Sequence, residues 1–246
     1  MYKFYLGFKF AFSYFSVFPI SFKSSDDLSE KEVLGAMLFF LPLVGFVLGI
    51  ASLTLFYLLE ERAWLAAIVA AMVYMMLYGF IHMEAVMDVA DALYATHSGK
   101  DAYAIIKEPT VGAMGVLYAL AFVLLKVAGV VYLLLDGYFM EFLAVLLVSR
   151  LSLLMLLKLH TFKSSFVTQL KASLNEYLLF SAFVLFSLLG WALSSYFLIL
   201  LMVGLLLAYF ISYFIKAKIG FVNGDVLGTT LESVEILLFL GIVAII

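Results

Sequence analysis

The chain has 246 residues, of which 67% are hydrophobic and only 13% charged, with a net charge of −3 and no cysteine. An ordinary soluble core could not bury so much apolar surface, so the composition excludes a soluble globular domain. The lack of cysteine excludes disulfides and thiol chemistry, and the small net charge does not favour nucleic acid as a partner. We therefore expect an integral membrane protein in contact with the lipid bilayer.

Apolar runs long enough for a helix to cross a bilayer, about 20 residues each, recur along the chain. They predict an all-α fold, a polytopic transmembrane helical bundle of about seven spans that forms a single domain over residues 1–246. Residues 1–20 contain Lys3 and Lys9 within an aromatic run, which predicts an N-terminal interfacial helix rather than a signal peptide. The run from Tyr177 to Ile215 is too long for one crossing and is divided at Ser194. The expected spans are residues 33–59, 64–83, 112–135, 138–157, 177–193, 196–215 and 231–246.

Basic residues are distributed unequally between the loops. Of the 14 lysines and arginines, Arg62 lies in the loops on one side, Lys126 and Arg150 fall inside expected spans, and the others lie in the loops on the opposite side. By the positive-inside rule the basic loops face the cytoplasm. This predicts that the long loops, and any site they carry, lie on the cytoplasmic side of the membrane.

Three carboxylates, Glu84, Asp88 and Asp91, follow directly after the second apolar run. On a helix, Asp88 and Asp91 each lie within about 40° of Glu84, so all three share one face. Like charges at this spacing repel and no basic residue is placed to neutralise them, so a bound cation is favoured over a merely solvated face. Oxygen ligands suit Mg²⁺ or Mn²⁺, and Mg²⁺ commonly combines one or two carboxylates with substrate phosphates. We predict a Mg²⁺ site here.

A glycine-rich segment, residues 220–228, precedes the last expected span. Glycines let backbone N–H groups approach an anion, and the start of the following helix favours phosphate. Asn223, Gly224 and Gly228 are therefore candidate substrate contacts, and Asp225 is a candidate to ligate a metal or hold a hydroxyl group. An ordinary Asn-Gly-Asp turn is the alternative interpretation.

Four other charged residues have candidate roles. Lys107 and Glu108 close the first long cytoplasmic loop, where Lys107 is a candidate phosphate contact and Glu108 a further acid or metal ligand. Arg150 lies within an apolar run, where a charge is costly and usually faces the bundle or a watery cavity. It is close enough to the cytoplasmic end to reach an anionic substrate. Lys126 is expected to snorkel to the surface or to pair with an acid.

The remaining polar residues are given more ordinary interpretations. His82 lies about 160° around the helix from Glu84, so we interpret it as an interfacial histidine, with a role as general base or substrate contact as the alternative. Glu232 and Glu235 are expected to open the last span, where acids suit a helix N-terminus. His160 is expected in a loop, and the sequence shows no partner for it.

Residues 82–92, His-Met-Glu-Ala-Val-Met-Asp-Val-Ala-Asp-Ala, resemble the H-x-D-G-x-x-D-x-x-D-G signature of cobalamin synthase, the adenosylcobinamide-GDP ribazoletransferase family. Other segments agree with the order of that family's motifs. Residues 16–19 resemble its T-R-x-P, 42–45 its P-x-x-G, 107–112 its R-D-x-x-x-G, 149–150 its S-R and 224–228 its G-D-x-L-G. The resemblance spans essentially the whole chain.

The chain departs from the family pattern at several of these positions. The departures are Val17 and Lys107 for arginine, Glu84 and Glu108 for aspartate, and Ala85 and Ala92 for glycine. Charge is preserved at each acidic position, and alanine is the smallest replacement for glycine. The sequence is therefore compatible with the expected metal site, although Mg²⁺ is strict about geometry.

The resemblance implies that adenosylcobinamide-GDP reacts with α-ribazole, or its phosphate, to give adenosylcobalamin, or its phosphate, and GMP. Attack of a ribose hydroxyl on a pyrophosphate bond requires charge neutralisation, in-line positioning and a base, but no covalent nucleophile. On this hypothesis the metal ligands are Glu84, Asp88 and Asp91, and the catalytic acids are Asp88, Asp91, Glu108 and Asp225. The expected substrate contacts are His82, Lys107, Arg150, Asn223, Gly224 and Gly228.

Two other functions are carried as alternatives. A CDP-alcohol phosphotransferase also uses a helix-borne acidic motif, but its motif is longer and has an arginine in the region where Met87 and Asp88 stand here. A cation-coupled transporter would account for Glu141, Lys126 and Arg150 inside spans. Against it, the sequence shows no inverted repeat or broken pair of helices, and the acids cluster at one surface. The sequence leaves formation of a homo-oligomer open.

Overall fold

The computed structural model describes residues 1–245, which form helices and contain no strand. The predicted all-α class is therefore confirmed. The helices are α1 (Tyr2–Phe15), α2 (Lys31–Phe39), α3 (Leu41–Leu58), α4 (Ala63–Leu77), α5 (Ile81–His97), α6 (Ala102–Ile106), α7 (Ala113–Leu135), α8 (Phe139–Leu159), α9 (Ser165–Ser173), α10 (Glu176–Leu193), α11 (Phe197–Ile219) and α12 (Gly224–Ile245), with a short 3₁₀ turn at Glu60–Arg62.

Within residues 1–245, six helices are individually long and apolar enough to cross a membrane: α3, α7, α8, α10, α11 and α12. A seventh candidate consists of α4 and α5 together, which are bent by 79° at a short break. The apolar residues of this pair lie in α4, whereas α5 carries the acids. We therefore place the crossing in α4 and place α5 at the membrane surface. An integral membrane bundle of about seven spans is confirmed.

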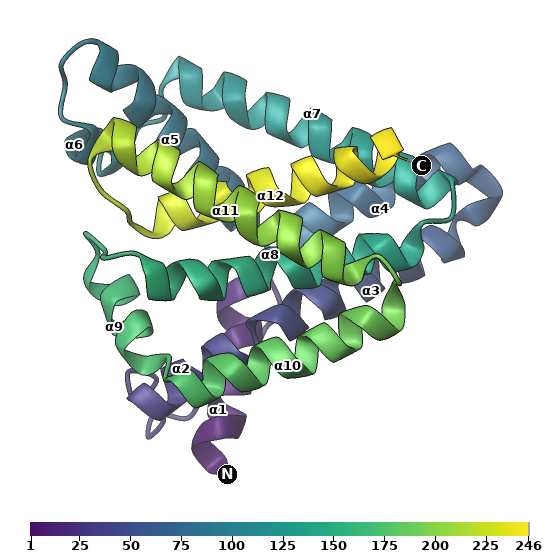
Figure 1. Cartoon of the computed structure of the whole chain (residues 1–246), viewed down its shortest axis with the longest axis horizontal. Coiled ribbons are helices and arrows are strands. Elements are labelled where there is room, and N and C mark those ends of the chain that lie inside the picture. Colours follow the sequence, from purple (N-terminus) through teal and green to yellow (C-terminus); the bar gives the residue numbers. More distant parts are fainter. Residues whose placement is uncertain (246) are drawn as a thin grey trace.

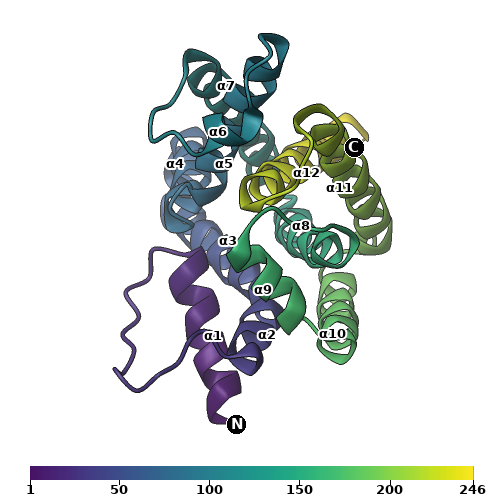
Figure 2. The same ribbon diagram turned by 90° about the vertical axis from the view of Figure 1, so that its left-hand side faces the viewer.

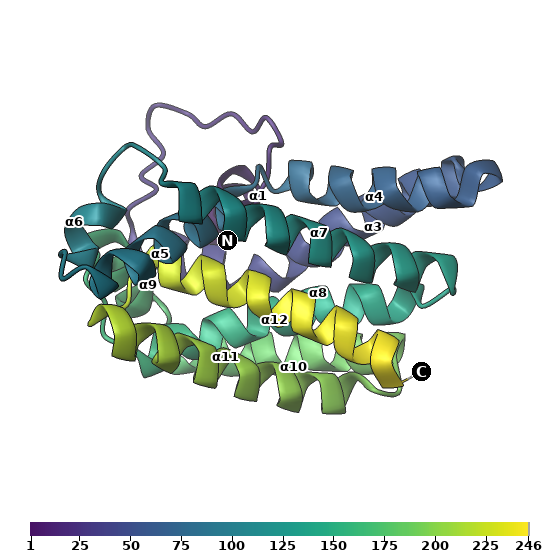
Figure 3. The same ribbon diagram turned by 90° about the horizontal axis from the view of Figure 1, so that it is seen from above.

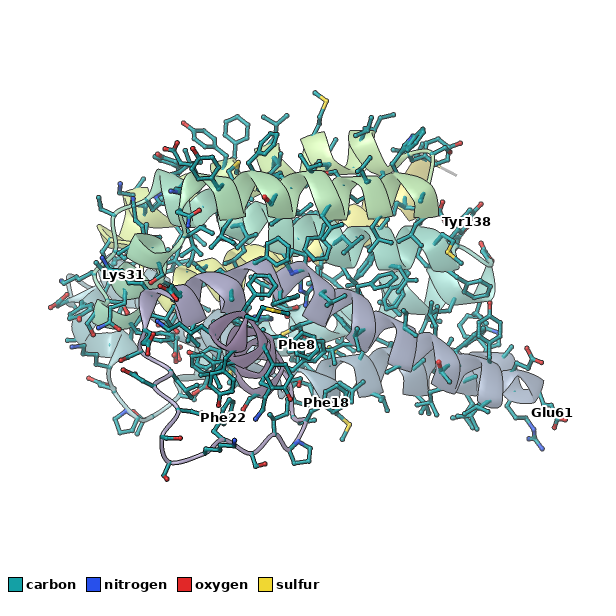
Figure 4. The ribbon with its side chains drawn as sticks, turned by 90° about the horizontal axis from the view of Figure 1, so that it is seen from below. Phe8, Phe18, Phe22, Lys31, Glu61 and Tyr138 are labelled. Carbon is teal, nitrogen blue, oxygen red and sulfur yellow. The ribbon has the colours of Figure 1, made fainter. Side chains whose placement is uncertain are left out.

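The long helices run side by side along the longest axis of the molecule (Figure 1). Helices α5, α6 and α9 and the start of α12 lie at one end, and the turns α3–α4, α7–α8 and α10–α11 lie at the other (Figure 3). Among the labelled side chains, Lys31 lies at the first end, and Glu61 and Tyr138 lie at the opposite end (Figure 4). The predicted basic loops are thus gathered at one end of the bundle.

The N-terminal helix α1 lies across the bundle rather than along it. In the end-on view α3, α8, α11 and α12 are seen nearly down their axes, whereas α1 runs across the picture (Figure 2). Tyr2, Phe4 and Tyr5 are exposed on its surface, and Leu6 and Phe12 are buried. A helix crosswise to the spans, with aromatic residues on its open face, has the orientation of the predicted interfacial helix.

The first expected span, residues 33–59, is in fact two helices that meet at Phe40. α2 ends at Phe39 and α3 begins at Leu41, with Pro42 in the first turn of α3. Proline has no N–H to donate, so it suits a first turn and disrupts a helix interior. Pro42 therefore marks the start of a new helix and not a kink within one.

The second expected span, residues 64–83, is broken by the bend between α4 and α5. α4 ends at Leu77, and Gly79 and Phe80 have positive φ angles of 66° and 53°. Glycine adopts such angles without steric cost, whereas a phenylalanine there is uncommon. The acids consequently lie on a separate helix and do not extend a span, and the expectation of no broken helix is wrong at this point.

The expected hairpin turn at Ser194 is confirmed, because α10 ends at Leu193 and α11 begins at Phe197. Ser194 Oγ donates a hydrogen bond of 3.0 Å to Glu141 Oε1 in the first turn of α8. Glu141 thus belongs to the end of the bundle that carries the short turns, and it ties the hairpin to α8.

Helix α8 occupies the centre of the bundle, surrounded in the end-on view by α3, α10, α11 and α12 (Figure 2). Two glycines of α3 allow α3 and α8 to approach each other closely. A Cβ atom at Gly49 would lie 2.6 Å from Leu146 Cδ1, and one at Gly45 would lie 2.7 Å from Arg150 Nε. These glycines therefore let α3 and α8 pack closely.

Candidate active site

The first turns of α5 pack against the first turns of α12, which brings acids from two helices together. A Cβ atom added at Gly228 would lie 2.8 Å from Ala85 Cβ, so the two backbones approach closely here. At the same crossing Thr229 Oγ1 donates a hydrogen bond of 2.9 Å to the Ala85 carbonyl oxygen. Asp225, one turn earlier on α12, consequently lies close enough to Glu84 and Asp88 for their charges to interact.

Asp88 lies among like charges. Burial, followed by the negative charges of Asp225, Glu84 and Asp91, raises the pKa of Asp88 to about 6. Within residues 1–245 none of these four acids has a lysine or arginine at ion-pair distance. The cluster therefore carries uncompensated negative charge, an arrangement that a bound cation stabilises.

Glu84 and Asp88 line a cavity of about 500 Å³, which we call the acidic cavity. The segment that connects α6 to α7 lines the same cavity and contributes Glu108, together with Pro109 and Val111. The structure therefore brings together three of the predicted site residues, from two segments that are separate in the sequence.

Asp91 is oriented toward the start of α7. Its Oδ2 accepts a hydrogen bond of 2.6 Å from the Gly112 N–H, and its Oδ1 accepts one of 2.8 Å from the Gly115 N–H. A Cβ atom at either glycine would lie 2.5 Å from an Asp91 oxygen, so both positions need glycine. The carboxylate satisfies N–H groups that the first turn of a helix leaves without partners.

The predicted convergence of three acids on one ion is not present in the structure. Among residues 1–245, no group of three His, Cys, Asp or Glu side chains is placed to hold one metal ion. The physical reason is that both oxygens of Asp91 are occupied by the α7 backbone. Glu84 and Asp88 remain together in the wall of the acidic cavity, and Asp225 lies close enough for its charge to act on Asp88.

The glycine-rich segment is a helix start and not an open loop. α12 begins at Gly224, so residues 224–228 form its first turn, and the expected span start at residue 231 is corrected. Asn223 is buried and organises this start, because its Oδ1 accepts a hydrogen bond of 3.1 Å from the Val226 N–H. Its Nδ2 donates one of 2.6 Å to Asp225 Oδ2, which orients that carboxylate.

Lys107 lies beside an aromatic ring. Its ammonium is 4.4 Å from the centroid of the Tyr103 ring, and that of Lys163 is 3.8 Å from the same centroid. The Lys163 N–H also donates a hydrogen bond of 2.8 Å to the Val222 carbonyl oxygen, which holds the loop after α8 against the start of α12. Neither Lys163 nor Tyr103 was predicted as a site residue, and the sequence marks Lys163 only by its place in a basic loop.

Arg150 is buried inside the bundle, whereas the sequence led us to expect a residue within reach of an anionic substrate. Its Nη1 pairs with Glu235 Oε1, and its Nη2 donates a hydrogen bond of 2.9 Å to the Tyr74 hydroxyl. Gly45 makes room for the guanidinium, as described above. In this structure the charge of Arg150 is therefore taken up by an acid of the protein itself.

Two further residues complete this buried network. Lys126 Nζ lies 2.6 Å from Glu232 Oε2 and 2.6 Å from Glu235 Oε2, and all three side chains are buried. The expectation that Glu232 and Glu235 open the last span is wrong, because α12 starts at Gly224 and places them more than two turns inside it. Together with Arg150, two cations balance two acids, as apolar surroundings require.

His82 lies on the side of α5 that faces α12. It is only 7% exposed, and its Nδ1 lies 3.6 Å from Glu232 Oε1, which is too long for a hydrogen bond. The ring lines a second cavity, together with Gly224, Asp225 and Gly228. The prediction that His82 does not share the carboxylate face is confirmed, whereas its expected place at an interface is corrected to a buried one.

Comparison with known proteins identifies the family of this chain. The model of the family described as cobalamin-5-phosphate synthase matches residues 7–243. The chain belongs to the cobalamin-5-phosphate synthase family. This confirms the family resemblance that the motifs indicated. No solved structure matches the chain.

Curated relatives named adenosylcobinamide-GDP ribazoletransferase align along nearly the whole chain. The relative from Brevibacillus brevis is 28% identical over 245 residues, which cover 95% of this chain and 96% of the relative. One from Clostridium perfringens is 26% identical over 264 aligned positions, covering 98% and 99%, respectively. One from Chlorobium chlorochromatii is 30% identical over 238 positions, covering 90% and 89%.

Two departures from the motifs of the cobalamin-5-phosphate synthase family lie at buried helix contacts. Ala85 stands at the α5–α12 crossing, where Gly228 provides the space for its methyl group. Ala92 is fully buried. Glu84, by contrast, lines the acidic cavity, where a longer carboxylate side chain has room. Packing against Gly228 thus accommodates Ala85, and the open space of the acidic cavity accommodates Glu84.

Proposed function

We propose that this chain is a membrane transferase that joins adenosylcobinamide-GDP to α-ribazole, or to its phosphate, and releases GMP. Membership of the cobalamin-5-phosphate synthase family over residues 7–243, in a chain whose acids line an open cavity, is the observation that carries the proposal. The names of the relatives state the same transfer for those proteins. The product would be adenosylcobalamin or its phosphate.

The charge of the site supports a divalent cation as part of the proposal. A nucleotide diphosphate is itself anionic, so it would be repelled by Glu84, Asp88 and Asp225 unless a cation lay between them. Two carboxylates with substrate phosphates form a donor set that suits Mg²⁺ or Mn²⁺. Glu84 and Asp88 are the residues that would hold the ion, with Asp225 beside them, and the bound ion would neutralise charge on the diphosphate oxygens.

The protein's own residues divide the remaining tasks. Lys107 and Lys163, whose ammonium groups lie 4.4 and 3.8 Å from the centroid of the Tyr103 ring, would attract the phosphates. The α7 start held by Asp91 would keep the wall of the acidic cavity in place. In the transfer, the acceptor oxygen forms a bond to phosphorus as the bond to the GMP oxygen breaks. The hydroxyl proton passes to a carboxylate, for which Asp225 and Glu108 are the candidates.

The location of the site follows from the charges of the loops. The acids lie at the end of the bundle that carries the lysine-rich loops, which by the positive-inside rule is the cytoplasmic end. We therefore propose a bacterial inner-membrane enzyme whose site opens to the cytoplasm, where nucleotide-activated substrates are made.

The proposal is tested with the purified protein in liposomes, supplied with adenosylcobinamide-GDP and α-ribazole with and without Mg²⁺. We expect Mg²⁺-dependent formation of adenosylcobalamin with an equal amount of GMP, and loss of both in Asp88→Ala. Glu61→Ala, an acid at the opposite end of the bundle, is the matched control and should remain active. Release of CMP from a CDP-alcohol substrate, or cation uptake without any nucleotide, would instead support the alternatives.

A further inference from the structure

A second cavity, of about 180 Å³, lies next to the acidic one and is lined mainly by apolar residues. Its walls come from α1, α2, α5, α8, α9 and α12, and we call it the apolar cavity. The side chains that give it this character include Tyr14, Phe15, Leu153, Leu157, Phe166 and Leu170. A concave apolar surface with few polar groups is typical of a site for the uncharged part of a small molecule.

Aromatic rings from two peripheral helices form one side of the apolar cavity. Tyr14 of α1 and Phe166 of α9 have ring centroids 5.5 Å apart with an interplanar angle of 36°, and Phe15 adjoins Tyr14 at 4.9 Å. Both α1 and α9 lie at the end-on face of the bundle, outside the central helices (Figure 2). The rings therefore offer flat surfaces to a flat ligand at the end of the molecule that carries the acids.

The polar side-chain groups of the apolar cavity are those of His82 and Asp225, together with the Tyr14 hydroxyl. Asp225 is also the acid whose charge acts on Asp88. The first turns of α5 separate the two cavities, because Ile81, His82 and Ala85 line the apolar cavity while Glu84 and Asp88 line the acidic one. A molecule with an apolar ring and a hydroxyl group could thus lie in the apolar cavity with its hydroxyl at Asp225, beside the acidic cavity.

We propose that the apolar cavity binds the aromatic base of the acceptor nucleoside, α-ribazole, an inference that rests on the proposed function. A dry cavity of about 150 Å³ holds a benzene molecule, so a cavity of 180 Å³ suits a small aromatic ring system and excludes a corrin macrocycle. The ribose would extend toward Asp225, and the diphosphate of the other substrate would lie in the acidic cavity. Donor and acceptor would then approach from opposite sides of α5.

The first test fills the apolar cavity. Val167 lines it and is buried, whereas Gln169 is exposed on the same helix and does not line it. We expect Val167→Phe to raise the KM for α-ribazole at least tenfold and to leave the KM for adenosylcobinamide-GDP within twofold. Gln169→Phe, the matched control, should change neither. An acceptor nucleoside with a single-ring base should be affected less by Val167→Phe than α-ribazole is.

A second variant keeps the inference testable if Val167→Phe does not fold. Phe166→Leu removes one half-buried aromatic ring from the wall of the cavity and adds no volume. We expect it to weaken the binding of α-ribazole about tenfold. Binding of α-ribazole alone is measured by equilibrium dialysis for the wild type and both variants, so that a readout exists without turnover.

The outcomes separate the two proposals. If the wild type turns over but both variants keep the wild-type KM for α-ribazole, the cavity assignment is overturned and the proposed function stands. The same holds if only the KM for adenosylcobinamide-GDP rises, or if the variants change bound lipid and nothing else. If the wild type binds α-ribazole but forms no cobalamin, and both variants fail to bind α-ribazole, the assignment of the cavity stands and the proposed function is overturned. Absence of both binding and turnover in the wild type overturns both.

Discussion

The protein contains two groups of charged side chains that obey opposite rules. In the middle of the bundle Lys126, Arg150, Glu232 and Glu235 are buried and balanced, each within contact of an opposite charge. At the end of the bundle the acids around Asp88 repel one another and have no cation of the protein at ion-pair distance within residues 1–245.

The difference indicates what each group is for. Charges inside an apolar bundle are tolerated only when they neutralise each other, so the balanced group holds α7, α8 and α12 together. Charges that stay unbalanced beside a cavity store unfavourable energy that a ligand can relieve. We therefore assign stability to the first group and ligand binding to the second, and the predictions below test that division.

The largest expected effect is on stability. Glu235→Gln leaves Arg150 buried without its acid, and breaking a buried pair by removing one partner typically costs about 3 kcal/mol or more. The free energy of unfolding in detergent should fall by that amount. In Arg150→Met combined with Glu235→Gln, the Lys126–Glu232 pair stays intact and charge balance returns, so part of the loss should be recovered. A double variant as unstable as the sum of the single variants would show that the pair is not coupled.

The second prediction concerns the unbalanced group. Asp88→Asn removes one of the repelling charges, and the pKa of Asp88, raised to about 6, shows that its ionised form is disfavoured in the fold. We expect thermal stability to stay the same or to increase, while GMP release falls about 100-fold or more, as for loss of a charge-stabilising group in an active site. Asp88→Asn that is both active and destabilised would reverse the division proposed here.

The same comparison explains what the sequence could predict. Membrane spans and the acid stripe depend on runs and offsets along the chain, so the bundle, the hairpin turn at Ser194 and the shared face of Glu84 and Asp88 were predictable. Helix breaks were harder, because Phe80 carries a positive φ angle although its residue type gives no warning. The pairing of Arg150 with Glu235 joins helices that are distant in the sequence, and no local pattern shows it.

The apolar cavity and Lys163 were not predictable for the same reason. Tyr14 and Phe166 contact each other only because α1 and α9 fold onto the same end of the bundle. Lys163 approaches Tyr103 through the loop after α8. Such juxtapositions arise from tertiary packing, which the spacing of residues along one helix does not encode.

A smaller effect is expected at Asp91, which the sequence grouped with the metal ligands. Its two hydrogen bonds to Gly112 and Gly115 resemble a helix cap, and loss of a capping side chain typically costs about 1 kcal/mol. Asp91→Ala should therefore lower stability by that amount and increase amide hydrogen exchange at the start of α7. The activity of Asp91→Ala should depend on the Mg²⁺ concentration in the same way as that of the wild type. A weaker apparent Mg²⁺ affinity in Asp91→Ala would return this residue to the metal ligands.

The smallest effect is expected at His160, a buried residue that belongs to neither group. Its Nε2 lies 2.9 Å from Ser212 Oγ, a partner that the sequence did not show. Burial, and then the nearby Lys216 and Lys171, lower the pKa of His160. A histidine whose pKa is lower in the folded than in the unfolded state contributes stability above the unfolded pKa of about 6.5, and that contribution is lost as the pH falls. Between pH 7.5 and 5, the melting temperature of His160→Gln should therefore fall less than that of the wild type, by about 2 °C. If the melting temperatures of the wild type and His160→Gln change equally with pH, the His160 imidazole has the same pKa in the folded and unfolded states, which would contradict this prediction.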